Sequence, residues 1–179
     1  MSTRDSNLGD IYVMNIDGTE PMRLTDHPAL ETSPCWSGDG TQIAFTRVRE
    51  GVSSRVYIVP ANGGTPHEVV AANGWAADPA WNPVTDELAF VLSKGNRNWG
   101  DIWFADSLKG IILRRWRYQG RESGLSWSDD GKMACCSHSA RPSGEHANLM
   151  AFIVDSSEVH KITNSQAADR EPDWWSPAE

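Results

Sequence analysis

The sequence is poor in the residue patterns that define several classes of protein. Three cysteines among 179 residues are too few for a disulfide framework, so packing has to supply the stability. No run approaches the roughly 18 apolar residues that a membrane-spanning helix needs. The residues after Met1 lack the apolar core of a secretion signal, so the cytoplasm is the default expectation and membrane insertion is not expected.

Positive charge is also scarce. The chain has 16 Lys and Arg against 24 Asp and Glu, and this formal net charge of −8 argues against a protein that wraps nucleic acid through bulk charge. One stretch, Arg114–Tyr118, combines basic and aromatic residues, but it falls on an expected outermost strand, where charge protects a sheet edge. We therefore expect no nucleic-acid partner.

Motifs of common catalytic and cofactor sites are missing. The sequence contains no HExxH, CxxC or GxSxG motif and no glycine-rich phosphate loop, and its five histidines are scattered. We therefore predict no catalytic residue, no metal site and no cofactor. The three cysteines, Cys35, Cys135 and Cys136, are interpreted as small buried hydrophobes.

Tryptophan, in contrast, is abundant and recurs at a near-constant interval. Of nine tryptophans, Trp36, Trp81, Trp127 and Trp175 are spaced by 45, 46 and 48 residues, within the recurring text SPCWSGDG, DPAWNPVTD, LSWSDDG and DWWSP. A second marker keeps the same period and includes Tyr12, Tyr57 and Trp103. We expect these aromatic anchors to fill the space between repeated units, because large flat side chains bury much area.

The fourth copy of the pattern contains two adjacent tryptophans. Trp174 keeps the Pro-x-Trp spacing from Pro172, whereas Trp175 keeps the Trp-Ser-Pro order. Either residue fits the anchor position, and we assign Trp175 to it.

Each repeat contains four segments of strand length separated by turn residues. The pairs Asp39-Gly40, Asn62-Gly63 and Asp130-Gly131 tolerate the positive φ of tight hairpins, so neighbouring segments should pair antiparallel. Asp39, Asp86 and Asp130 are expected to fix their turns by accepting backbone N–H groups. Four antiparallel strands repeated every ~45 residues predict an all-β fold, a β-propeller with about four four-stranded blades. We expect one domain, residues 1–179, with units near 1–45, 46–90, 91–136 and 137–179.

The text DIYVMNIDGTEPMRLT…PCWSGDGTQIAFTR resembles the TolB-like β-propeller repeat, also called PD40 and related to WD40 repeats. The third unit departs from the pattern, since Leu125 stands where Pro34 and Pro79 stand. The resemblance covers essentially the whole chain and implies the propeller fold. It implies less about function, because the family includes interaction scaffolds, periplasmic components and accessory domains of peptidases and lyases.

Strand order in this family implies that the segment ending at the marker tryptophan is innermost. Residues 2–5 then align with a second strand, and the sequence ends just past an innermost strand. Three arrangements are open: a segment of a longer propeller, a ring completed by a second chain as a homo-oligomer, or an imperfect self-closed ring of four blades.

Candidate ligand contacts lie before the innermost strands. Acidic residues occur there in every unit and could form a ring at one mouth of the channel that binds a cation, an amine or a basic peptide: Glu31, Asp78, Glu122 and Glu171. Local turn contacts are the alternative role for these residues. Trp75 and Trp99 are out of phase, in loops expected at the same mouth, where they would contact a ligand or anchor the loops.

The sequence therefore favours a non-enzymatic binding or scaffold module that recognises a protein, peptide or small ligand through loops at the channel mouth. Two alternatives stay open. The chain could be the propeller portion of a larger enzyme, such as a peptidase or a polysaccharide lyase, or a structural repeat fragment that assembles without a ligand.

Overall fold

The computed structural model describes residues 2–5, 8–69, 73–95, 100–117, 120–141, 146–156 and 158–174. Within these ranges the chain forms fifteen strands and no helix, as the all-β prediction requires. Consequently, the described residues contain no helix long and apolar enough to span a bilayer.

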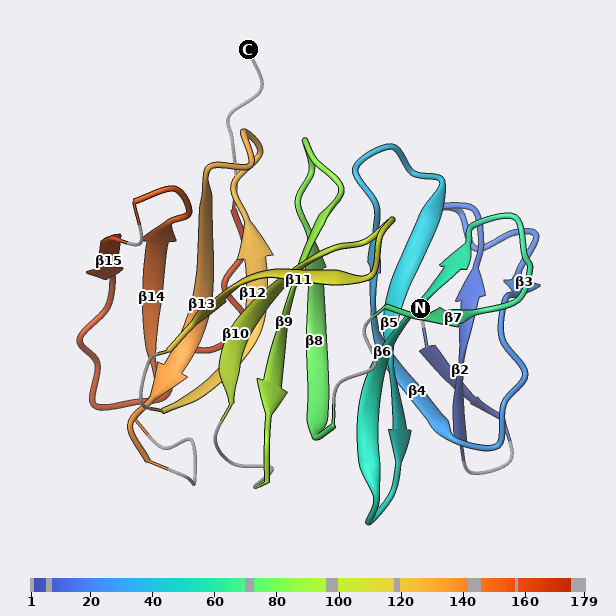
Figure 1. Ribbon diagram of the computed structural model, residues 1–179. Helices are drawn as coiled ribbons and strands as arrows, with labels where there is room; N and C mark the ends of the chain where they lie inside the picture. The colour runs from blue at the N-terminus through green and yellow to red at the C-terminus, as the bar shows by residue number, and fades with distance from the viewer. Residues whose placement is uncertain are drawn as a thin grey trace.

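The strands form three sheets of three, eight and four strands, and a single parallel pairing of Ser54 with Trp75 joins the two antiparallel halves of the eight-stranded sheet. We call the resulting four antiparallel units blades 1 to 4 (Figure 1). Blade 1 consists of β1 (Ser2–Asp5), β2 (Leu8–Val13) and β3 (Met22–Arg23). Blade 2 consists of β4 (Leu30–Trp36), β5 (Gln42–Arg49), β6 (Ser53–Pro60) and β7 (His67–Glu68). Blade 3 consists of β8 (Trp75–Trp81), β9 (Glu87–Ser93), β10 (Asp101–Asp106) and β11 (Ile111–Trp116). Blade 4 consists of β12 (Arg121–Trp127), β13 (Met133–Ser139), β14 (Asn148–Ile153) and β15 (Glu158–Lys161).

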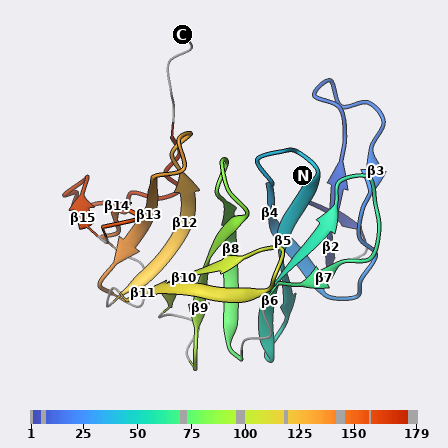
Figure 2. The same cartoon turned by 45° about the horizontal axis from the view of Figure 1, so that its top comes forward.

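The blades follow one another along an open arc. Figures 1 and 2 both place blade 1 and blade 4 at opposite ends of the row. The inner strands β4, β8 and β12 contact one another across blades, which places them on the inside of the arc. The arrangement agrees with the predicted incomplete ring and not with a self-closed ring of four blades.

Turn chemistry explains where the inner hairpins reverse. Asp39 Oδ1 accepts hydrogen bonds from the Ser37 hydroxyl at 2.6 Å and the Thr41 N–H at 3.0 Å. Asp130 does the same with Ser128 at 2.7 Å and Lys132 at 3.0 Å. These hydrogen bonds lower the pKa of both carboxyl groups. Both aspartates therefore fix their turns as predicted.

The corresponding turn of blade 3 departs from this pattern. Asn82 Oδ1, rather than the predicted Asp86, accepts the N–H groups of Val84 at 2.9 Å and Thr85 at 3.1 Å. The Asn82 side-chain amide also donates to the Gly131 carbonyl of blade 4 at 3.0 Å. An amide replaces the carboxylate here because only an amide can both accept from its own turn and donate to the next blade.

Apolar side chains gather between consecutive blades. On β5, neighbouring residues point to opposite faces, so Phe45 packs toward blade 1 and Ala44 toward blade 3. Phe90 joins the cluster between blades 2 and 3, and Phe104 meets Phe152 edge-on between blades 3 and 4. Each blade therefore depends on its neighbours for burial.

The tryptophan anchors occupy these interfaces in two of the three inner strands. Trp81 is 8% exposed and Trp127 is 6% exposed, whereas Trp36 is 52% exposed, which contradicts the expectation for that residue. The Trp127 indole N–H donates to the Ala80 carbonyl of the preceding inner strand at 2.9 Å. Among the described residues, blade 1 offers Trp36 no such inner strand.

The second set of anchors is partly buried. Tyr57 stacks on Phe45 with ring centroids 5.9 Å apart, and Trp103 packs against the cluster between blades 2 and 3. Tyr12 is half-buried on β2.

Trp174 makes the contact expected of a fourth anchor. Its indole N–H donates to the Ser126 carbonyl at 3.3 Å, which repeats the contact of Trp127 with Ala80 one blade later. Trp175, which the sequence pattern assigned to this position, lies outside the described residues. With Trp174 as the anchor, the spacings become 45, 46 and 47 residues.

Trp127→Ala should lower the free energy of unfolding by about 3–5 kcal/mol, because it leaves a cavity between blades 3 and 4. Trp127→Phe retains most of the volume but leaves the buried Ala80 carbonyl without its donor, which costs about 1–3 kcal/mol. Urea unfolding of the three proteins measures both effects. Equal stability of Trp127→Ala and the unmodified chain would show that the indole does not join the blades.

Candidate functional site

Each inner strand is interrupted by a bulge just before its tryptophan. The pairing register shifts between Thr32 and Cys35 in β4, and β8 and β12 shift at the equivalent places. The residue three positions before each anchor has a positive φ: Ser33 (52°), Asp78 (50°), Gly124 (61°) and Glu171 (53°). Such backbone is uncommon for residues other than glycine and clusters at functional sites. We call these four residues the inner row.

The members of the inner row contact one another across blades. Asp78 Oδ1 accepts from the Ser33 hydroxyl at 3.5 Å, and Asp78 Oδ2 accepts from the Gly124 N–H at 3.3 Å. A Cβ atom at Gly124 would lie 3.2 Å from the Glu171 Cα, which is tight enough to force a shift. The row therefore continues from blade 2 through blades 3 and 4 to the segment that contains Glu171.

Two adjoining cavities open along this row, and together we call them the inner groove. One, of about 420 Å³, is lined by all four residues of the row. The other, of about 370 Å³, extends toward Trp75 and Glu122. Ser33, Asp78 and Ser123 line both cavities.

The structure brings together only part of the predicted acidic ring. Asp78 is half-buried and Glu171 is exposed, and both line the inner groove. Glu122 lies in the groove wall with its side chain buried, and Glu31 is fully buried away from the groove. Trp75 lines the groove, whereas Trp99 lies outside the described residues. The part these residues play in binding stays a prediction.

The four residues of the predicted acidic ring occupy two structurally different positions. With Trp174 as the fourth anchor, Asp78 and Glu171 both precede their tryptophan by three residues, whereas Glu31 and Glu122 precede theirs by five. The first position is the left-handed bulge, and the second points between blades. The constant offset of three would also have identified Ser33 and Gly124, which the sequence reasoning missed.

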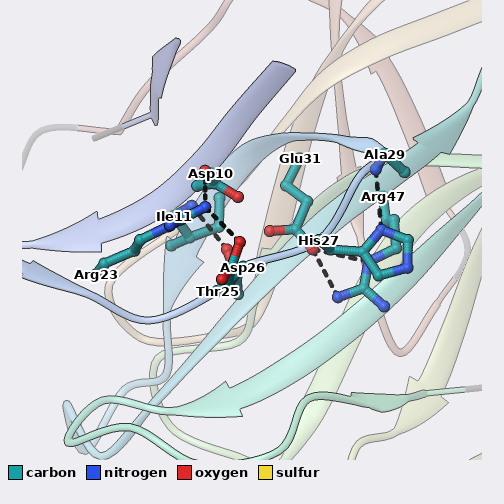
Figure 3. Close-up of polar contacts among 9 residues, drawn as sticks. All are labelled: Asp10, Ile11, Arg23, Thr25, Asp26, His27, Ala29, Glu31 and Arg47. Atoms are coloured by element: carbon teal, nitrogen blue, oxygen red, sulfur yellow. Dashed lines mark hydrogen bonds and ion pairs between the residues drawn. The ribbon is translucent and has the colours of Figure 1, made fainter. Parts of the chain in front are cut away.

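Glu31 forms a buried ion pair between blades 1 and 2 (Figure 3). The Arg47 guanidinium donates to Glu31 Oε1 through Nε at 2.7 Å and through Nη2 at 2.6 Å. It also lies over the Tyr57 ring, 4.2 Å from the centroid. We interpret this ion pair as structural, since each charge has its partner within the protein.

Neighbouring polar residues in Figure 3 hold blade 1 together. Arg23 Nη2 contacts Asp10 Oδ2 and Asp26 Oδ1, each at 2.7 Å, and so ties β2 to the segment after β3. The Thr25 hydroxyl oxygen accepts the Ile11 N–H at 2.9 Å. Burial, reinforced by the charge of Arg47, lowers the pKa of His27. These contacts are structural rather than ligand-directed.

In each complete blade, the residue five positions before the marker tryptophan opposes one residue of the second strand, and the chemistry of this pair differs from blade to blade. Glu31 pairs with Arg47 in blade 2, Ala76 with Leu92 in blade 3, and Glu122 with His138 in blade 4. The distance from His138 Nδ1 to Glu122 Oε1 is 3.1 Å. Burial raises the pKa of Glu122, and the hydrogen bond with His138 opposes that rise.

Among the described residues, no group of three or more His, Cys, Asp and Glu side chains is arranged to hold a metal ion. Burial raises the pKa of the Cys35 thiol to about 12 and that of the Cys135 thiol to about 11, so both stay protonated near neutral pH. The inner groove is lined by carboxylates, hydroxyls, the Trp75 side chain and two arginines, Arg121 and Arg170.

Arg47→Leu should lower the free energy of unfolding by about 3–5 kcal/mol, because it leaves the Glu31 carboxylate buried without its cation. The double variant Glu31→Ala/Arg47→Leu copies the Ala76–Leu92 pair of blade 3 and should recover most of that loss. Urea unfolding curves measure both variants. A double variant no more stable than the single one would refute the equivalence of these positions.

Glu122 should make stability depend on pH with a defined sign. Between the ordinary value of 4.5 and its raised pKa, the folded protein binds more protons than the unfolded chain, so the contribution of Glu122 falls as pH rises. Glu122→Gln removes this dependence. Between about pH 4 and 7, the melting temperature of the unmodified chain should fall relative to that of the variant as pH rises. A constant difference would contradict the assignment.

Comparison with known proteins agrees with the architecture. Residues 1–178 match the model of the TolB beta propeller domain, PD40. The chain is 26% identical over 172 residues to the uncharacterized peptidase YuxL of Bacillus subtilis, covering 94% of this chain and 24% of that protein. It is 36% identical over 95 residues to the Tol-Pal system protein TolB of Desulfosudis oleivorans, covering 52% of this chain and 20% of that protein.

A solved structure, of putative TolB from Agrobacterium tumefaciens, has the same fold with a TM-score of 0.59 and 20% identity, and the match covers 87% of this chain and 70% of that one. The chain spans only about a quarter or less of the two curated relatives, at 24% and 20% of their lengths. The family match nevertheless covers nearly every residue, and its repeat is the blade described above. This chain belongs to the TolB β-propeller family.

Proposed function

We propose that this chain is a non-enzymatic recognition module whose inner groove binds a protein segment that carries basic side chains. The observation that carries the proposal is the inner row, in which left-handed residues of β4, β8 and β12 and of the segment that contains Glu171 line one groove that includes Asp78 and Glu171. A residue other than glycine in the left-handed conformation costs about 1–3 kcal/mol of folding free energy. Such residues persist where the surrounding structure and function require them.

The groove suits an extended segment better than a compact small molecule. Its two cavities adjoin along the row and cross three blades, from Ser33 on β4 to Gly124 on β12. Asp78 and Glu171 attract cationic side chains, and Trp75 offers a ring face for a cation or an apolar side chain. The exposed Arg121 and Arg170 also line the groove, so each disfavours a basic residue beside it and restricts how the segment can lie.

The overall charge and the family support a protein partner. The net charge of −8 favours approach by basic segments. One relative is named as a protein of the Tol-Pal system, which is more consistent with binding than with catalysis. We extend that role to this chain because rigid blades hold variable groove residues in fixed positions.

Hexalysine is a suitable probe, with binding measured by isothermal titration calorimetry. Asp78→Asn/Glu171→Gln should weaken binding about tenfold or more, since it removes both carboxylates of the row. Glu50→Gln/Asp155→Asn is the matched control, because it removes the same two charges from exposed residues outside the inner groove. Equal weakening by both double variants would mean that bulk charge alone binds the probe and would refute the groove as the site.

A second candidate function is the propeller portion of a peptidase-type enzyme. It is favoured by the relative named as a peptidase, in which 94% of this chain corresponds to 24% of the protein. In that case the inner groove would face a catalytic domain or its substrate. A hydrolase domain encoded in the same reading frame would favour this candidate over an independent recognition module.

A further inference from the structure

The cavity of about 370 Å³ that extends toward Trp75, which we call the Trp75 cavity, has a cation at its wall. This cation is Arg121, an exposed residue at the start of β12. Within the described part of the chain, no carboxylate forms an ion pair with it. Arg47, in contrast, has the Glu31 carboxylate at 2.6 Å. An unpaired guanidinium at a cavity wall offers its N–H donors to an anionic group of a bound molecule.

Two buried polar atoms in residues of the same cavity wall also lack a hydrogen-bond partner among the described residues. They are Oε2 of Glu122 and the hydroxyl oxygen of Thr46, and both residues line the Trp75 cavity. Glu122 is 5% exposed and Thr46 is 2% exposed. A buried polar atom without a partner is destabilising, so its presence in a native protein points to a water molecule or a ligand.

The equivalent hydroxyl of blade 4 does have a partner. Ser137 has the register position of Thr46, because Ser123 opposes Ser137 as Thr32 opposes Thr46. The Ser137 hydroxyl donates to the Asp169 carbonyl at 2.7 Å. A position that is satisfied within blade 4 is therefore left unsatisfied at the Trp75 cavity.

The negative and positive charges of this cavity are separated along β12. Asp78 Oδ2 accepts the Gly124 N–H at 3.3 Å, so the Asp78 carboxylate lies beside Gly124. Arg121 precedes Gly124 by three residues in the sequence. Because a strand rises about 3.3 Å per residue, the backbone positions of the two charges are about 10 Å apart along β12.

We propose that the inner groove selects a protein segment of mixed charge, in which a basic side chain pairs with Asp78 and an acidic side chain pairs with Arg121. This inference rests on the proposed function, because it specifies the kind of segment that the groove binds. Both charged residues line the Trp75 cavity, so one segment that occupies this cavity meets both of them.

The separation of the two charges sets the spacing in the segment. In the polyproline II conformation, which leaves the backbone without internal hydrogen bonds, residues three positions apart lie on the same side. Their separation is about 9 Å, at a rise of about 3.1 Å per residue. This length matches the distance along β12 between the positions of Asp78 and Arg121. The bound segment therefore carries its basic and its acidic residue three positions apart.

Arg121 distinguishes this recognition from attraction by overall charge. The net charge of −8 favours the approach of any basic peptide. The local charge of Arg121 acts in the opposite direction, because it repels a second basic residue and attracts an acidic one. A segment with both signs in the required places gains two contacts, whereas a wholly basic segment gains one and meets repulsion at the other.

Two blocked peptides of equal composition and equal net charge test the spacing. The charges are three positions apart in Ala-Lys-Ala-Ala-Glu-Ala and adjacent in Ala-Ala-Lys-Glu-Ala-Ala. NMR titration of the isotope-labelled chain measures weak dissociation constants and follows the Gly124 amide, which lies at the site. The spaced peptide, or its reverse Ala-Glu-Ala-Ala-Lys-Ala, should bind about threefold or more tighter than the adjacent one. Equal binding of all three peptides would overturn the inference.

Charge reversal at Arg121 tests the acidic contact itself. Arg121→Glu should weaken the tighter spaced peptide about threefold or more and strengthen Ala-Lys-Ala-Ala-Lys-Ala by a similar factor, because repulsion and attraction exchange places. Lys161→Glu is the matched control, since it reverses the same charge at an exposed residue of the outermost strand β15. This control should leave the ratio of the two affinities nearly unchanged.

The outcomes separate this inference from the proposed function. If Arg121→Glu changes the ratio of affinities no more than Lys161→Glu does, the mixed-charge requirement is wrong, while binding of basic peptides at Asp78 still stands. If no peptide, hexalysine included, shifts the Gly124 amide of the unmodified chain, the groove is not the binding site and both proposals are wrong.

Discussion

The contact between neighbouring blades is the interaction on which this structure depends. Blades 2 and 3 are apolar on both faces, and blades 1 and 4 each contribute one apolar face, so the described core lies between neighbouring blades. The indole of Trp127 adds direction to this packing, since its N–H donates to a carbonyl of the previous inner strand. Stability therefore accumulates from interface to interface along the arc, as in other repeat proteins.

Rigid interfaces allow the inner strands to carry unusual backbone. The bulges of β4, β8 and β12 turn Ser33, Asp78 and Gly124 toward one another, and hydrogen bonds across the blades hold them there. A loop without such support would relax out of the left-handed conformation. The inner strands therefore determine the shape of the groove. Substitution at a few groove positions can change its chemistry without altering the blades.

Much of the fold follows from the period of the sequence. The recurring tryptophan, the Asp-Gly turns around Asp39 and Asp130, and the four strand-length segments together predict the blades and their antiparallel pairing. The prediction is wrong where one function passes to a different residue, since Asn82 replaces Asp86 in its turn. Of the two adjacent tryptophans that fit the fourth anchor position, Trp174 makes an indole contact, and Trp175 lies outside the described residues. Neither outcome can be read from spacing, because each depends on a contact with the neighbouring blade.

The pairs Glu31–Arg47, Ala76–Leu92 and Glu122–His138 share one register position but differ in charge and polarity. Repeats that descend from a common unit risk docking in the wrong order while the chain folds, because identical faces fit one another equally well. A blade 2 that docked in the wrong order would bury its Glu31–Arg47 ion pair against an apolar face like the one that packs around Leu92. Divergence at this single position therefore gives blades 2, 3 and 4 chemically different faces toward the blade that precedes each of them.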